Sequence, residues 1–389
     1  MTDVVKKEFK TIELSEGFKF SGRVDSKEDL RRILLESIKH KTSNIFIQPR
    51  RPILFMINGK LQALSHDHIT FQDMEGLCIW ASNQDGAMST INGGGNINCR
   101  LEVMIPSDEQ LKAPKRLGFR VNISSITEAG TITAQIVIRP IPENPPPLSK
   151  IGFSETIVNA MCQKNGISII AGETGVGKTT TFASIISYIL QNDTPIKGNI
   201  IEHAEPIEYT YSSIFSEHSI IVQSSIPENF SSFAAANAEA MRRKPALILI
   251  GELREESSIQ AAVEASKTGH PVFATVHALD PTMVVSRLIT RFPPEQHSAA
   301  INDICAALRV IVSQTLVPSV SGLLVAARSW IALTKEHRAR LSLLNKVEDV
   351  TRAMSEIMDA DGHTYEDEAK RLLQEGTINE EVALSIRRL

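Results

Sequence analysis

The pattern of hydrophobic positions changes character near residue 140. Before it, short apolar segments alternate with polar residues and turn signals, which is typical of a small α+β unit. After it, uninterrupted apolar runs alternate with stretches of helical spacing. Such runs predict parallel strands that helices cover on both faces. We therefore expect an N-terminal α+β domain over 1–139, a linker over 140–147 and an α/β domain over 148–389.

Individual elements of the first domain can be predicted from turn and capping signals. Ser26 is a suitable N-cap for a helix over 27–40, in which Leu30, Ile33, Leu34 and Ile38 share one face. Asn58-Gly59 predicts a tight hairpin, and Gly93–Gly95 predicts a flexible loop. Strands are expected at 44–48, 53–57, 61–64, 119–124 and 131–138.

The predicted linker contains five prolines between Pro140 and Pro147. Proline fixes φ and lacks a backbone donor, so this segment should not continue a helix or a central strand. An extended polyproline conformation is favoured instead. A proline-rich surface loop within a single domain remains the alternative.

The most specific motif follows the apolar run 167–171. It matches GxxxxGK[ST], and the helical pattern of 180–190 comes directly after it. Its glycines let backbone N–H groups approach phosphate oxygens. Lys178 would reach the β- and γ-phosphates of a nucleoside triphosphate, and the Thr179 hydroxyl would bind Mg²⁺. The predicted nucleotide-binding residues are Gly172, Glu173, Thr174, Gly175, Val176, Gly177, Lys178, Thr179 and Thr180.

Three later segments place polar side chains where apolar runs end. The run 246–250 leads to Glu252, which we expect to face Mg²⁺ or the attacking water. The run at 200–201 leads to Glu202, Glu205 and Glu208, a second source of a general base. The run 271–276 has His270 before it and His277 after it. Without a carboxylate partner a metal site is disfavoured there, and His277 suits a donor to the γ-phosphate.

Composition narrows the classes of partner. The formal net charge is −4 and 5% of residues are aromatic. The protein as a whole should therefore not attract nucleic acid, and few aromatic side chains are available to stack on bases. A local basic patch is still possible. The four cysteines are scattered without a CxxC pair, and neither a signal peptide nor a membrane span is predicted.

The order of these motifs resembles the hexameric secretion ATPases. That family includes the pilus-retraction ATPases of the PilT type and the type IV secretion ATPases. The resemblance rests on the phosphate loop, Glu205–Glu208, Arg242–Pro245, Gly251–Arg254 and Thr268–His277. Three segments are more similar to the branch of DotB, from type IVB secretion, and its IncI-type conjugation counterpart TraJ. They are Val222–Pro227, Met241–Pro245 and Gly269–Val272.

The resemblance implies a RecA-like ATPase domain, a PAS-like N-terminal domain, and ATP with Mg²⁺ as cofactors. It also implies that Glu252 is the Walker B acid and that Glu252 and Thr179 bind the metal. Glu205 would belong to the acidic box, and His270 and His277 to the histidine box. Arg242 would be catalytic, and Arg120 and Arg139 are possible arginines that act on a neighbouring subunit's site. The chain departs from the family pattern at three places. Ala204 stands where an acidic residue is usual, and Ala238 where an arginine is usual. Ser125-Ile126-Thr127 replaces a segment that commonly carries trans-acting arginines.

The implied protein is a cytoplasmic homohexamer docked peripherally, through protein partners, on an inner-membrane secretion or conjugation complex. By ATP hydrolysis it would power type IVB secretion or conjugative DNA transfer, without sequence-specific nucleic-acid binding of its own. Three alternatives stay open. They are a type IV pilus retraction motor, a nucleotide-gated assembly scaffold with little hydrolysis, and, disfavoured by charge and aromatic content, a nucleic-acid translocase.

Overall fold

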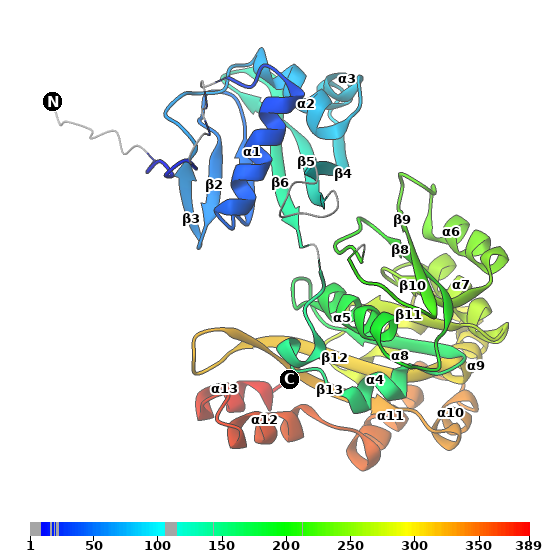
Figure 1. Cartoon of the computed structure of the whole chain (residues 1–389). Helices are drawn as coiled ribbons and strands as arrows, with labels where there is room; N and C mark the ends of the chain where they lie inside the picture. The colour runs from blue at the N-terminus through cyan, green and yellow to red at the C-terminus, as the bar shows by residue number, and fades with distance from the viewer. Residues whose placement is uncertain are drawn as a thin grey trace. The chain divides into compact units, whose positions relative to one another are not determined.

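A computed structural model describes residues 9–15, 18, 20, 23–105, 115–142, 144–211 and 213–389. The chain forms two compact units, Met1–Glu143 and Asn144–Leu389, and each is described on its own (Figure 1). The predicted absence of a signal peptide concerns residues 1–8, which lie outside the described ranges. Within those ranges, none of the helices combines the length and the apolar character that crossing a bilayer requires.

The first unit is built on an antiparallel sheet in the order β3-β2-β1-β6-β5-β4. Its helices pack on one face, and their apolar residues join the inward side chains of the strands in one core. Strand β4 shows the alternation of buried and outward residues that a half-covered sheet requires. The elements are α1 (Lys27–Lys39), β1 (Asn44–Ile47), β2 (Leu54–Ile57), β3 (Lys60–Ala63), α2 (Asp73–Ser82), α3 (Ala87–Asn92), β4 (Asn96–Ile105), β5 (Lys115–Glu128) and β6 (Thr131–Ile141).

Several sequence predictions in this unit are confirmed. The Ser26 side chain accepts a hydrogen bond from Asp29 N and caps α1. Asn58 and Gly59 both have positive φ, as a two-residue hairpin turn between β2 and β3 needs. The sequence did not predict β4, α2 or α3. The architecture is α+β as expected, and its finer description as PAS-like stays a prediction.

The predicted loop at Gly93–Gly95 lies between α3 and β4, and each of its glycine N–H groups donates to a carbonyl of the last turn of α3. One prediction here needs correction. Pro140 does continue a strand: it pairs with Phe119 of β5. Strand β1 reaches only Ile138 on the other side of β6, so Pro140 sits where β6 has one neighbour and a missing donor costs little. The non-strand part of the linker is therefore shorter than 140–147.

The second unit contains a mixed sheet in the order β13-β12-β7-β11-β10-β8-β9. Strands β7 to β12 of this sheet run parallel, and β13 pairs antiparallel with β12 at one edge. The strands are β7 (Gly166–Ala171), β8 (Gly198–Ala204), β9 (Ser219–Ser225), β10 (Pro245–Ile250), β11 (Pro271–Val276), β12 (Leu308–Pro318) and β13 (Leu324–Ala332).

Helices cover both faces of this sheet, as the uninterrupted apolar runs predicted (Figure 1). The helices are η1 (Leu148–Ile151), α4 (Glu155–Met161), α5 (Lys178–Gln191), α6 (Phe233–Ala240), η2 (Met241–Arg243), α7 (Glu256–Lys267), α8 (Pro281–Ile289), η3 (Pro294–Gln296), α9 (His297–Ala307), α10 (Lys335–Ser342), α11 (Val347–Asp361), α12 (Tyr365–Gln374) and α13 (Glu380–Ile386).

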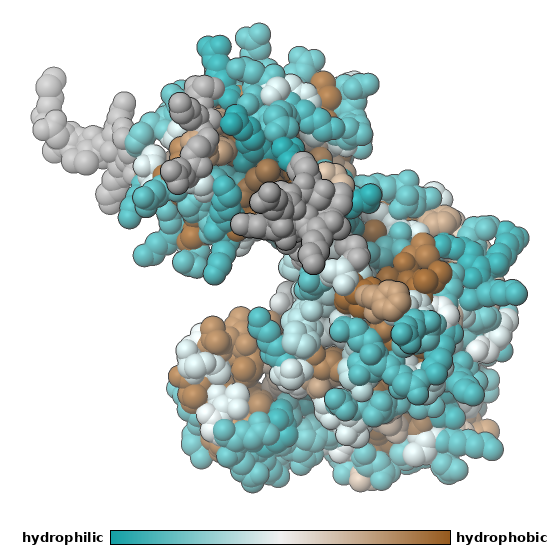
Figure 2. Space-filling view, in the orientation of Figure 1, coloured by the Kyte–Doolittle hydropathy of each residue, from teal (hydrophilic) through white to brown (hydrophobic). Residues whose placement is uncertain are grey.

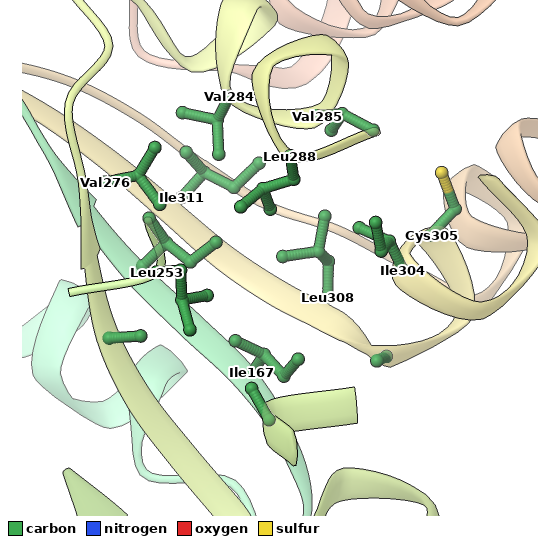
Figure 3. Packing of buried hydrophobic residues seen from close by; sticks show 14 of the residues in the cluster. Ile167, Leu253, Val276, Val284, Val285, Leu288, Ile304, Cys305, Leu308 and Ile311 are labelled. Atoms are coloured by element: carbon green, nitrogen blue, oxygen red, sulfur yellow. The ribbon is translucent and has the colours of Figure 1, made fainter. Parts of the chain in front are cut away.

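Alternate residues of each central strand enter two different cores. Ile248 and Ile250 of β10 pack in the core with α7, α8, α9 and α11, while Leu247 and Leu249 pack in the core with α4 and α5. Figure 3 shows the first core, where Leu288 of α8 lies beside Leu308 and Ile311 of β12. Because helices cover both faces, the sheet is held rigidly, and its polar groups can reach solvent only at the ends of the strands.

Candidate nucleotide-binding site

The glycine motif forms a tight loop between β7 and α5. Gly172, Gly175 and Gly177 all have positive φ, and Gly177 immediately precedes the helix. A Cβ at Gly172 would lie 2.4 Å from the carbonyl oxygen of Gln314, so this position admits only glycine. The loop therefore directs backbone N–H groups and the N-terminus of α5 toward one small volume, an arrangement that binds phosphate.

Lys178 is folded back across this loop. Its side chain is buried, and Nζ donates to the carbonyl oxygens of Gly172 at 2.8 Å and Glu173 at 2.7 Å. Burial lowers the pKa of the Lys178 ammonium, and the charges of Glu252 and Glu173 partly oppose that effect. Both partners are weak carbonyl acceptors that an anion can replace. The cation is thus held at the place where a phosphate would lie.

Glu252 and His277 are brought together beside the loop. His277 Nε2 lies 3.3 Å from Glu252 Oε1. The turns that carry them are joined, because Leu253 N donates to Thr275 O at 2.9 Å and Thr275 Oγ1 donates to Gly251 O. The pKa of His277 is lowered mainly by burial and then by the charge of Lys178. His277 is therefore a neutral imidazole at pH 7, able to donate one hydrogen bond.

The acidic segment after β8 lies farther from the loop. Strand order places His277 one strand from β7, Glu252 two and Glu205 three. With strands about 4.8 Å apart, Glu205 begins about 14 Å from the loop. Glu205 is exposed at the same end of the sheet. Glu202 is buried within β8 and accepts a hydrogen bond from Gln223 Nε2 at 2.7 Å, so it is held as a structural group.

The structure does not bring His270 and Arg242 to this end of their own sheet. His270 precedes β11 and His277 follows it, so about 20 Å of strand separates the two histidines. Arg242 lies in η2, before β10, whereas Glu252 follows that strand. Arg242 is exposed and forms an ion pair with Glu239. Neither residue can act on the loop of its own chain in this arrangement.

The two predicted trans arginines lie in the first unit. Arg120 of β5 and Arg139 of β6 are directly opposite in the register, and Arg100 of β4 is opposite Arg120. Their neighbours Phe119, Val121 and Ile138 are buried, so by strand alternation the arginines are on the sheet's other face. Arg100 forms an ion pair with Glu102 of β4 at 3.0 Å, so this face carries an acidic side chain as well. Arg100 was not anticipated from the sequence.

The sequence analysis did not identify the residues whose side chains hold the loop and the start of α5 by hydrogen bonds. Gln314 Nε2 donates to Val176 O at 2.6 Å, and its Oε1 accepts from Thr181 Oγ1 at 3.0 Å. Tyr209 OH lies 2.9 Å from Thr180 Oγ1. The signal for Gln314 was available: an amide within the apolar run 308–317 must have buried partners.

The residues fit a nucleotide and its magnesium ion. The glycine loop and Lys178 offer donors and positive charge for phosphates, and the half-buried Thr179 lies in the first turn of α5. Within the described ranges, no group of three or more histidine, cysteine, aspartate or glutamate side chains forms a metal cage. Thr179 and Glu252 are the residues that would hold Mg²⁺ beside bound phosphate.

Comparison with known proteins gives consistent relatives. A family model described as "Type II/IV secretion system protein" matches residues 24–340. The X-ray structure of the Yersinia pseudotuberculosis ATPase DotB is 42% identical with a TM-score of 0.80, and the match covers 98% of each chain. The Legionella pneumophila ATPase DotB is 30% identical with a TM-score of 0.84, over 94% of this chain and 96% of that one. The pilus retraction motor PilT, solved with bound ADP, is 25% identical with a TM-score of 0.77, over 92% and 96%.

Proposed function

The chain belongs to the family of type II/IV secretion system proteins, and we propose that it is a Mg²⁺-dependent ATPase that works as a homohexameric ring. Relatives that match it over most of its length are named as ATPases, and one was solved with ADP. The observation that carries the proposal is Lys178, buried in the glycine loop with Glu252 and His277 beside it.

The residues divide the work of hydrolysis by position. The loop N–H groups and Lys178 hold the phosphates and neutralise their charge, which is most of what phosphoryl transfer requires. Mg²⁺ would add further charge neutralisation at the phosphates. Glu252 is placed to orient the attacking water, and neutral His277 to donate to the γ-phosphate. Glu205 could assist only at the outer side of a bound nucleotide, given its distance from β7.

A ring would let one chain contribute residues to the site of its neighbour. The basic row of Arg100, Arg120 and Arg139 lies in the first unit, and one chain holds a single phosphate loop. We propose that this row contacts the nucleotide of a neighbouring subunit and completes its site. Arg242 is another residue that could reach a neighbour's nucleotide.

The biological setting follows from the DotB-like resemblance. We propose that the ring acts at the cytoplasmic side of an inner-membrane type IVB secretion or conjugation complex and docks through protein contacts. Figure 2 shows hydrophobic areas over the β12–β13 hairpin and α13, where Val320, Leu323, Leu324 and Leu384 are exposed. Exposed apolar groups of this kind suit contact with a protein partner. A pilus retraction ATPase is the second candidate, because PilT shares the fold.

Three measurements test the proposal. Purified protein should release phosphate from Mg-ATP, and light scattering with Mg-ATP should report a hexamer. Loss of the gene should stop substrate transfer while the envelope complex remains. A protein that stays monomeric with nucleotide, or a deletion strain that transfers normally, contradicts it. A protein that forms the ring but does not hydrolyse ATP would instead be the assembly scaffold that Ala204 makes conceivable.

A further inference from the structure

The phosphate loop is connected through the interior of the second unit to the point where the chain enters that unit. The connection is formed by two facing residues of the last two strands, Gln314 of β12 and Arg328 of β13, which are directly opposite in the register. Both are buried, with 2% and 4% of their surface exposed. Burying polar groups of this kind is costly unless they are hydrogen-bonded, so both side chains depend on their partners.

Gln314 sets the orientation of one peptide unit of the loop. Its Nε2 donates to Val176 O at 2.6 Å. The peptide bond is planar and trans, so the C=O of Val176 and the N–H of Gly177 point in opposite directions. Holding the carbonyl toward Gln314 therefore turns the Gly177 N–H away from it, toward the side where phosphate binds. Thr181 Oγ1 donates to Gln314 Oε1 at 3.0 Å and fixes the amide.

Arg328 carries the connection onward from Gln314. Its Nε donates to Gln314 Oε1 at 3.3 Å, its Nη1 to Gly152 O at 2.8 Å and its Nη2 to Ile151 O at 2.9 Å. The guanidinium also lies over the Phe153 ring, 4.9 Å from the centroid. Burial lowers the pKa of Arg328 to about 10, so it stays charged at neutral pH. One planar group thus holds the amide of Gln314 and two consecutive carbonyls.

The two carbonyls belong to the segment that follows the boundary between the units. Ile151 ends η1, and Gly152 has a φ of 59°. The second unit begins at Asn144, so Arg328 fixes the chain within ten residues of its entry. On the other side, Arg328 N donates to Glu368 Oε1 of α12 at 3.4 Å. Glu368 is itself held by Arg371 and His363, so the entry segment is tied to a fixed part of the unit.

We propose that Gln314 and Arg328 are positioning residues that couple the phosphate loop to the entry segment, residues 148–153. Binding of phosphate fixes the Val176–Gly177 peptide, and this fixes Gln314, Arg328 and the carbonyls of Ile151 and Gly152 in turn. Release of nucleotide loosens the same set. Nucleotide occupancy is thereby transmitted to the chain that leads to the first unit. This inference rests on the proposed nucleotide site and adds a route by which nucleotide binding there controls the mobility of the entry segment.

The test uses the full-length protein and nucleotide-dependent hydrogen exchange. In the wild type, Mg-ADP should slow exchange in peptides covering residues 148–160. Gln314→Ala leaves the Val176 carbonyl without its partner, so ADP affinity should fall about tenfold, the usual effect of orphaning one buried acceptor. Arg328→Lys keeps a buried positive charge but cannot serve three acceptors in a plane. It should bind ADP within about threefold of wild type and lose the protection of 148–160.

Ser329→Ala is the matched control. It changes the next residue of β13, which is also buried, and within the described part of the chain its hydroxyl has no hydrogen-bond partner. Affinity and protection should both be unchanged, and melting temperatures of all three variants verify folding. Wild-type ADP affinity in Gln314→Ala, or wild-type protection in Arg328→Lys, overturns the inference. A wild type that binds ADP with protection but never hydrolyses ATP refutes the ATPase proposal and leaves the coupling standing.

Discussion

His277 Nε2 lies 3.3 Å from Glu252 Oε1, although the two residues end different strands of the sheet. The contact exists because β10 and β11 are parallel neighbours with Ile250 opposite Ala274. Their following turns are then joined through Thr275, whose backbone and hydroxyl bond Leu253 and Gly251. An acid that can orient water and a neutral donor are thereby fixed as a pair next to Lys178.

Replacing the loop cation or the strand-end acid should separate binding from chemistry. Lys178→Ala should abolish ATP turnover and leave the fold intact, because Nζ bonds only two loop carbonyls in the described structure. Glu252→Gln should still bind ATP but hydrolyse it slowly, since a neutral amide neither polarises water nor complements Mg²⁺. Steady-state phosphate release measures both variants, and turnover at the wild-type rate in either one contradicts the assignment.

The two histidines around β11 should differ in their effect on turnover. His277→Ala removes a donor close to the γ-phosphate and should lower kcat about 10²-fold. His270→Ala is a matched control at the opposite end of the same strand, where the ring contacts Thr268 Oγ1, and should change kcat less than twofold. Steady-state hydrolysis at saturating Mg-ATP compares them. Equal losses would show that His270 acts too, through a neighbouring subunit.

The acidic box offers a second paired comparison. If Glu205 performs the work of the acid missing at Ala204, Glu205→Gln should lower kcat at least about 10²-fold. Glu202→Gln should cost little in rate, because Glu202 is buried and its role is to accept from Gln223. The kcat values at saturating Mg-ATP decide between them. Small and equal effects would leave Glu252 as the catalytic acid by itself.

A buried histidine should make folding stability depend on pH. His203 is fully buried. Burial and then the charge of Arg243 lower the pKa of His203 to about 4, and a hydrogen bond with the backbone of Ala236 opposes them only in part. The unfolded chain therefore takes up the proton first as pH falls. Stability from this residue is complete above pH 6.5 and is lost between pH 6.5 and 4.

His203→Leu should remove that dependence. The free energy of unfolding of the variant minus that of wild type should be about 2 kcal/mol larger at pH 5 than at pH 8. Urea denaturation at the two pH values measures it. His68→Leu, at an exposed position, is the control and should show no such change. A pH-independent difference for His203→Leu would mean that the imidazole is solvated or paired in solution.

Local signals determined a large part of this protein from the sequence alone. Ser26 specifies the start of α1 and Asn58-Gly59 the hairpin, because capping and positive-φ turns depend on a few adjacent residues. The glycine loop and Lys178 are likewise contiguous, so their spacing alone predicted a phosphate site. Apolar runs predicted a two-faced parallel sheet for the same reason: burial on both faces requires them.

Only the tertiary structure decided which distant residues meet. Strand order is not written in any local pattern, so the sequence could not show that His277 reaches Glu252. Nor could it pair Gln314 with Arg328, since antiparallel register is fixed by the closure of β12 on β13. Arg328 was visible in the sequence as a lone charge in an apolar run. Its role could be assigned only from the fold, because a buried charge is stabilised only by the acceptors that packing places around it.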